Sequence, residues 1–180
     1  MKNSCTATAG IVAAVVAGVI SGAGPAHADA WSEQVLAAHN AVRAQYDAPP
    51  LTWNSDLYPG VLRQAQSCRF PHSESPVRYG ENLFATRHAS VGIAEAVASW
   101  MQEMALYDYA NPAFSPSTGH FTQVVWKSTT QVAAAVMTCP PNTVIPGYSG
   151  NATYIVARYT PAGNFPDQFR ENVAGPAAFR

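Results

Sequence analysis

The sequence has few cysteines, little charge and no long apolar run. Charged side chains make up 12% of the 180 residues and the formal net charge is −1. This charge gives no electrostatic basis for binding nucleic acid or an anionic membrane. The main apolar run, Ile11–Ile20, is broken by Gly18 and is shorter than the roughly 20 residues of a membrane-spanning helix. Neither a His-Glu-x-x-His motif nor a Gly-x-Ser-x-Gly motif is present.

The first thirty residues have the pattern of a secretory signal peptide. Lys2 is the one charged side chain before the apolar run, and small residues at alternate positions follow it. We expect cleavage after Ala28 or Ala30, which makes residues 1–30 a leader and 31–180 one domain. The sequence therefore predicts a secreted, extracellular protein that is not an integral membrane protein, and we expect a monomer.

Of the 3 cysteines, Cys5 lies in the predicted leader, so Cys68 and Cys139 remain. In an exported chain two cysteines permit one intramolecular disulfide, which would stabilise the fold by roughly 3–5 kcal/mol in the chain-entropy model. The alternative is that Cys68 is a thiol nucleophile beside His72.

Three helices are predicted. The first spans 31–46 with Ser32 as its N-cap, the second about 55–68, and the third follows a cap at Ser90. The third helix has an inward apolar stripe, spaced by four, three and four residues: Ile93, Val97, Trp100 and Met104. Beside that stripe Glu103 needs a partner, because an unpaired carboxylate in such a place is costly. The first helix carries a polar cluster, expected to hydrogen-bond a neighbouring loop: His39, Asn40 and Arg43.

The stretch 119–126 alternates with the period of a β-strand, which would put His120 at one end of the strand and Trp126 at the other. Its Thr, Val, Phe and Trp residues favour strands. We therefore predict strands at His120–Lys127, Val132–Cys139 and Tyr154–Tyr159. Helices with a short antiparallel sheet make an α+β fold.

Gly119-His120-Phe121-Thr122-Gln123-Val124-Val125-Trp126 resembles the leading signature of the CAP superfamily, which comprises cysteine-rich secretory proteins, insect antigen 5 and plant pathogenesis-related proteins of class 1. The segment 154–165 resembles its second signature. Gly80-Glu81-Asn82-Leu83 and Trp100 followed by Glu103 match further motifs in the expected order.

The resemblance implies a three-layer α-β-α sandwich with a shallow central cavity. It also implies the residues that line this cavity: His72, Glu81, Glu103 and His120. In several relatives the two histidines bind a divalent metal, often zinc, and a carboxylate on the other nitrogen would fix each ring. With only two protein ligands, His72 and His120, binding should be weak, and acidification should expel the metal. The alternative is a hydrogen-bonded network that holds loops to the sheet.

Two alanines depart from the family pattern. Ala134 and Ala157 stand where relatives generally carry cysteines that bridge one another, so one whole disulfide is missing. The resemblance implies that Cys68–Cys139 is the surviving bridge. Because the gap between His72 and Glu81 varies among relatives, His72 is the least secure member of the cavity set.

For function, the resemblance favours a non-enzymatic binding module for sterols or other small lipids. In sterol-binding fungal relatives the equivalent aromatic loop is involved, and here it contains Tyr107, Tyr109, Pro112 and Phe114. The alternative is that these rings pack onto their own domain.

Two other function classes stay open. One is a metal-dependent hydrolase or protease in which Glu81 or Glu103 is the general base. The other is a secreted protein–protein effector. Asn151-Ala152-Thr153 is an N-glycosylation sequon, which matters only in a eukaryotic host.

Overall fold

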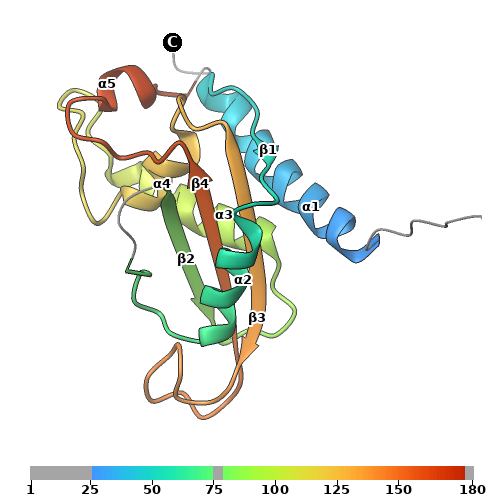
Figure 1. Ribbon diagram of the computed structural model, residues 1–180. Coiled ribbons are helices and arrows are strands. Elements are labelled where there is room, and N and C mark those ends of the chain that lie inside the picture. Colours follow the sequence, from blue (N-terminus) through green and yellow to red (C-terminus); the bar gives the residue numbers. More distant parts are fainter. Residues whose placement is uncertain (1–25, 75–78, 177–180) are drawn as a thin grey trace, which may run out of the picture.

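A computed structural model describes residues 26–74 and 79–176 (Figure 1). The predicted helices and the predicted strands β3 and β4 are present, with further elements between them. In chain order the elements are α1 (Ala26–Arg43), the 3-10 helix η1 (Ala44–Tyr46), β1 (Thr52–Trp53), α2 (Tyr58–Ser67), β2 (Gly80–Thr86), α3 (Ile93–Gln102), the 3-10 helix η2 (Glu103–Leu106), α4 (Gly119–Val125), β3 (Gln131–Cys139), β4 (Ala152–Thr160) and α5 (Phe169–Asn172).

The sheet has four strands in the order β1-β3-β4-β2. β4 pairs antiparallel with β3 and with β2, whereas the two-residue β1 is parallel to β3. The strands β1 and β2 were not predicted from the sequence. β2 is an edge strand, and Trp100 Nε1 of α3 donates to Leu83 O at 3.1 Å, which covers part of that edge.

Two apolar clusters lie on opposite faces of the sheet, so the fold has three layers. Along β4 the side chains alternate: Ile155 and Ala157 join the cluster under α1, α3 and α4, while Tyr154 and Val156 join the cluster under α2. Figure 1 shows α2 on one face and α3 on the other. The expected α-β-α arrangement is confirmed.

The prediction of a strand at His120–Lys127 was wrong, because α4 (Gly119–Val125) is a helix. Phe121 to Val125 are all buried, polar Thr122 and Gln123 included, so burial does not alternate along this stretch. A short helix that is buried over five consecutive residues shows no 3.6-residue periodicity of apolar positions, and its β-branched and aromatic residues then resemble a strand.

Side chains from other elements hold both ends of α4. Glu103 Oε2 accepts the backbone N–H groups of His120 at 2.9 Å and Phe121 at 3.1 Å. At the other end Arg43 Nη1 donates to Val124 O at 2.8 Å and to Trp126 O at 2.9 Å. These bonds satisfy backbone groups that a short helix leaves open, and they outweigh poor intrinsic helix propensity.

Three smaller predictions about the helices were wrong. Ser32 lies inside α1, which begins at Ala26, and the cap of α3 is Gly92, not Ser90. Gly92 N–H donates to Glu95 Oε2 at 3.0 Å, and Ser90 instead has φ 63°. Of the predicted stripe, Ile93, Val97 and Trp100 on α3 are buried, but Met104 lies in η2 and is 36% exposed.

Most of the predicted leader lies outside the described residues, and its cleavage stays a prediction. None of the helices in the described part of the chain combines the length and the apolarity needed to cross a bilayer.

Asn40 and Arg43 of the polar cluster on α1 tie the helix to neighbouring loops, as predicted, whereas His39 bonds instead to Val35 O of its own helix and to Tyr159 of β4. Asn40 and Leu51 bond reciprocally, with Leu51 N–H 2.7 Å from Asn40 Oδ1 and Asn40 Nδ2 3.1 Å from Leu51 O. Arg43 Nε also donates to Pro49 O at 2.8 Å. Burial lowers the pKa of Arg43 to about 10, so this fully buried guanidinium is still a cation at neutral pH.

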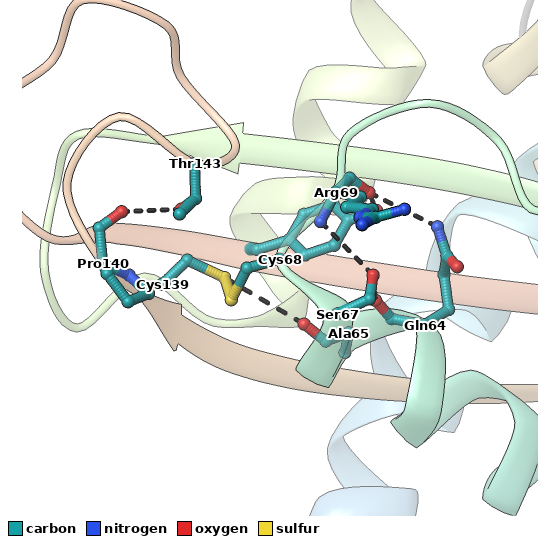
Figure 2. The surroundings of a disulfide bond; sticks show 9 residues. Gln64, Ala65, Ser67, Cys68, Arg69, Cys139, Pro140 and Thr143 are labelled. Atoms are coloured by element: carbon teal, nitrogen blue, oxygen red, sulfur yellow. Dashed lines mark hydrogen bonds between the residues drawn. A yellow bond between two sulfur atoms is a disulfide. The ribbon is translucent and has the colours of Figure 1, made fainter.

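Cys68 and Cys139 form a disulfide that joins the end of α2 to the end of β3 (Figure 2). The alternative of a free thiol nucleophile at Cys68 is therefore wrong. Ala134 and Ala157 are direct partners across β3 and β4, and both are fully buried. Trp31 Nε1 donates to Ala134 O, so the Ala134 peptide groups face away from β4 and this pair is of the non-hydrogen-bonded kind.

Candidate ligand and metal site

A cavity of about 540 Å³ opens beside the first turn of α4 and the start of β2. Three of the four predicted residues line it directly: His72, Glu81 and His120. The fourth, Glu103, bonds to His120. Polar and aromatic side chains share the remaining wall, namely Tyr79, Asn82, Phe114, Gln123, Asn164 and Phe165.

His120 is held by three contacts. Its Nδ1 donates to Glu103 Oε1 at 2.6 Å, and its own backbone N–H donates to the second oxygen of the same carboxylate. Its ring stacks on Trp100 with 6.3 Å between centroids. One carboxylate therefore fixes both the ring and the first turn of the helix that carries it.

His72 bonds to the other carboxylate. His72 Nδ1 donates to Glu81 Oε1 at 3.2 Å, and Ser73 N–H donates to that oxygen at 3.0 Å. Glu81 Oε2 accepts Ser73 Oγ at 2.7 Å and Arg158 Nε at 2.9 Å. Glu81 and Arg158 are cross-strand partners on β2 and β4, and the guanidinium lies 4.1 Å from the centre of the Tyr79 ring.

The pKa of Glu81 is lowered to about 2. Burial of the carboxyl group is the largest single influence and raises the pKa, but the hydrogen bonds from His72, Ser73 and Arg158 together outweigh it. Glu81 is therefore ionised at every pH near neutrality. A carboxylate in this state accepts a proton poorly, which disfavours Glu81 as a general base.

In both histidines the Nδ1 atom is used by a carboxylate, so Nε2 is the nitrogen left for a ligand. Neutral imidazole nitrogens suit zinc, and a carboxylate behind each ring is the usual outer partner of such ligands. Within the described ranges no group of three or more His, Cys, Asp or Glu residues could hold a metal. Any cation in this cavity would therefore have at most these two imidazoles as histidine ligands, with its other positions left to solvent.

A buried chain of hydrogen bonds behind His120 was not foreseen. Asn82 Nδ2 donates to His120 O at 3.0 Å and to Tyr159 Oη at 3.4 Å. His39 Nδ1 donates to Val35 O at 2.8 Å, and burial lowers the His39 pKa to about 4, so the ring is neutral. Its Nε2 must then accept from Tyr159 Oη at 2.9 Å.

Gln123 closes the floor of the cavity. Its Oε1 accepts Gly163 N–H at 2.8 Å and its Nε2 donates to Thr129 Oγ1 at 3.1 Å. A Cβ on Gly80 would clash with Gln123 Oε1, so glycine is required there for close packing. His120 and Gln123, three residues apart, share this wall because α4 is a helix.

The predicted lipid-binding loop divides into two parts. Tyr107 is buried against Phe121, with 5.6 Å between ring centroids, and Tyr109 packs edge-on against Tyr107 at 4.8 Å. Pro112 is half-buried, and Phe114 is 55% exposed and lines the cavity. Of the four residues, only Phe114 is positioned to contact a ligand in this cavity.

Residues 36–159 match the family model described as CAP, cysteine-rich secretory protein family. The chain belongs to this family. Among its relatives is Protein PRY2 of Saccharomyces cerevisiae, 38% identical over 148 residues that are 79% of this chain and 41% of that protein. Pathogenesis-related protein 1 of Arabidopsis thaliana is 31% identical over 162 residues, 88% of this chain and 91% of that protein. The chain therefore spans about two fifths of the yeast relative and most of the plant one.

Solved structures share the fold. The crystal structure of NaASP2 with Zn2+ is 21% identical, covers 81% of this chain and 86% of its own, and superposes with a TM-score of 0.61. Hookworm Platelet Inhibitor is 19% identical, with coverages of 84% and 80% and a TM-score of 0.62. The predicted CAP fold is confirmed.

Proposed function

We propose that this CAP-domain protein is a non-enzymatic, extracellular binding module whose central cavity holds a divalent cation weakly. Zinc is the candidate. The observation that carries the proposal is that His72 and His120 line one cavity, each with Nδ1 hydrogen-bonded to its own glutamate. The crystal structure of the related NaASP2 with Zn2+ supports the choice of metal. The disulfide fits an oxidising compartment.

Isothermal titration with Zn2+ tests the cation site. We expect one saturable site in the wild type, and a loss of about tenfold or more in affinity for His72→Ala and for His120→Ala. His88→Ala is the matched control, since His88 is exposed and outside the cavity wall. If His88→Ala abolished the heat of Zn2+ binding as strongly as the two cavity variants do, the proposed site would be refuted. Affinity should also fall on acidification, since only neutral imidazole binds a metal.

Hydrolysis is the less supported alternative. Both carboxylates are occupied, because Glu81 accepts bonds from three residues and Glu103 accepts from His120 and Phe121. A general base must instead be free to take a proton from water. Peptidase activity that disappears with chelator and in Glu103→Gln would reverse this preference.

Sterol or other small-lipid binding is a second candidate function. It is favoured by exposed aromatic rings at the cavity, since Phe114 is 55% and Phe165 is 39% exposed there. Such rings suit a flat apolar ligand. We expect saturable binding of labelled cholesterol or ergosterol that Phe114→Ser weakens and that Tyr109→Ser, whose ring packs on Tyr107, affects less. Binding unchanged by Phe114→Ser would remove this candidate.

A further inference from the structure

The two cavity histidines are held to different degrees. The His120 side chain is 30% exposed, bonds to Glu103 at 2.6 Å and stacks on Trp100. The His72 side chain is 62% exposed, and its ring has a 3.2 Å bond to Glu81 as its one hydrogen bond within the described part of the chain. The position of the His72 ring therefore depends on the backbone that carries it.

The start of that backbone, Arg69–Pro71, is fastened by side chains of α2 and β4, whereas Ser73 is held by Glu81 and Arg158. Gln64 Nε2, on α2, donates to Arg69 O at 3.3 Å and to Pro71 O at 3.1 Å. Tyr154 Oη, on β4, donates to Arg69 O at 2.8 Å. Figure 2 shows Gln64 reaching across to Arg69 immediately after the disulfide at Cys68.

These anchors act on the segment through its carbonyl groups rather than through Glu81. Tyr154 is fully buried, and burial raises the pKa of its hydroxyl to about 12, so it is a permanent hydrogen-bond donor near neutral pH. Gln64 contacts two carbonyl groups of the segment, those of Arg69 and Pro71, and thereby limits its rotation. Together with the disulfide, these hydrogen bonds restrain the backbone that leads to His72.

We propose that Gln64 and Tyr154 are positioning residues that set His72 for cation binding, an inference that rests on the cation site proposed above. Without them the Arg69–Ser73 segment would sample more conformations, and cation binding would carry the entropic cost of ordering it. His120 needs no such device, because Glu103 and Trp100 already fix it.

Tyr154→Phe and Gln64→Ala test the proposal, with Tyr148→Phe as the matched control. Tyr148 Oη also donates to a loop carbonyl, Arg87 O at 3.3 Å, but that loop carries no proposed ligand. We expect the Zn2+ affinity to fall about tenfold in each test variant and to stay unchanged in the control. Urea unfolding checks that each variant is folded at the temperature of the binding measurement, and Gln64→Ala keeps the test open should Tyr154→Phe fail to fold.

A metal-free measurement separates this inference from the cation site itself. Ser73 N–H donates to Glu81 at 3.0 Å, so its hydrogen exchange reports the order of the segment. We expect faster exchange at Ser73 in both test variants and not in Tyr148→Phe. If the wild type binds no Zn2+, the cation site fails and the exchange rates still decide whether Gln64 and Tyr154 order the segment. Unchanged exchange, or unchanged Zn2+ affinity in a binding wild type, overturns the positioning role.

Discussion

Glu103 and His120 are 17 positions apart, yet one carboxylate accepts from both the ring and the backbone of the same histidine. Oε1 receives Nδ1 at 2.6 Å and Oε2 receives the backbone N–H at 2.9 Å. The candidate ligand and the start of α4 therefore depend on a single side chain.

Replacing Glu103 by Gln should reduce both stability and cation affinity. The amide offers one acceptor oxygen where two are used, and it lacks the charge that strengthens these bonds. We expect a loss of about 1–3 kcal/mol in the free energy of unfolding, measured in urea, and about tenfold weaker Zn2+ binding. Glu95→Gln is the control, because Glu95 also caps a helix, at Gly92, but lies outside the cavity wall. Equal effects of the two variants on Zn2+ affinity would contradict the prediction.

Buried His39 should make the fold sensitive to acid. Its folded pKa is lowered to about 4 by burial, from an ordinary value of 6.5, so the unfolded chain binds the proton more readily. The stabilising effect of the neutral ring is complete above pH 6.5 and is lost as pH falls toward 4. Urea unfolding in chelator at several pH values should show this decline, and His39→Gln should flatten it. His88→Ala, at an exposed site, should leave the decline of unfolding free energy with falling pH unchanged.

Protonation of Glu81 should cause a second loss of folding stability at lower pH. Its folded pKa is about 2 against an ordinary 4.5, so its stabilising contribution is present above pH 4.5 and disappears as pH falls toward 2. The size is on the order of 3 kcal/mol, because a tenfold difference in proton affinity corresponds to about 1.4 kcal/mol. Unfolding free energies between pH 5 and pH 2 that do not decline more steeply in the wild type than in Glu81→Gln would contradict this assignment.

Restoring the missing bridge should stabilise the protein. Ala134 and Ala157 face each other in a non-hydrogen-bonded pair, where opposed side chains approach most closely. In aerated buffer, where oxygen is the oxidant, Ala134→Cys with Ala157→Cys should form a disulfide and raise the free energy of unfolding by about 3 kcal/mol. Thiol quantification and urea unfolding check this. Ala133→Cys with Ala157→Cys should leave free thiols, because Ala133 points to the opposite face.

Tyr107→Phe should be neutral or stabilising. The Tyr107 hydroxyl is buried and has no hydrogen-bond partner among residues 26–74 and 79–176, whereas its ring packs on Phe121. Removing an unsatisfied hydroxyl while keeping the ring should raise the free energy of unfolding by up to about 1 kcal/mol. Tyr159→Phe should instead destabilise, because the Tyr159 hydroxyl bonds to His39. A marked loss of stability in Tyr107→Phe would show that its hydroxyl has a partner in solution.

The residue pattern alone was sufficient to predict much of the fold of this protein. Local signals such as the apolar spacing on Ile93–Trp100, the strand-favouring residues of β3 and β4, and the two remaining cysteines lie within short stretches of sequence, so the α+β class and the disulfide could be predicted. Motif resemblance then pointed to the residues that meet at the cavity.

Tertiary contacts decided the rest. Whether 119–125 forms a helix depends on Glu103 and Arg43, which bond to its two ends from elsewhere in the chain. Intrinsic helix propensity depends on the residues of the segment alone, so it carries no information about these distant partners. The His39–Tyr159–Asn82 connection and the anchoring of His72 by Gln64 and Tyr154 likewise join residues far apart in sequence. Local preferences amount to fractions of a kcal/mol per residue, whereas satisfying a buried polar group is worth more, so the packed structure overrides them.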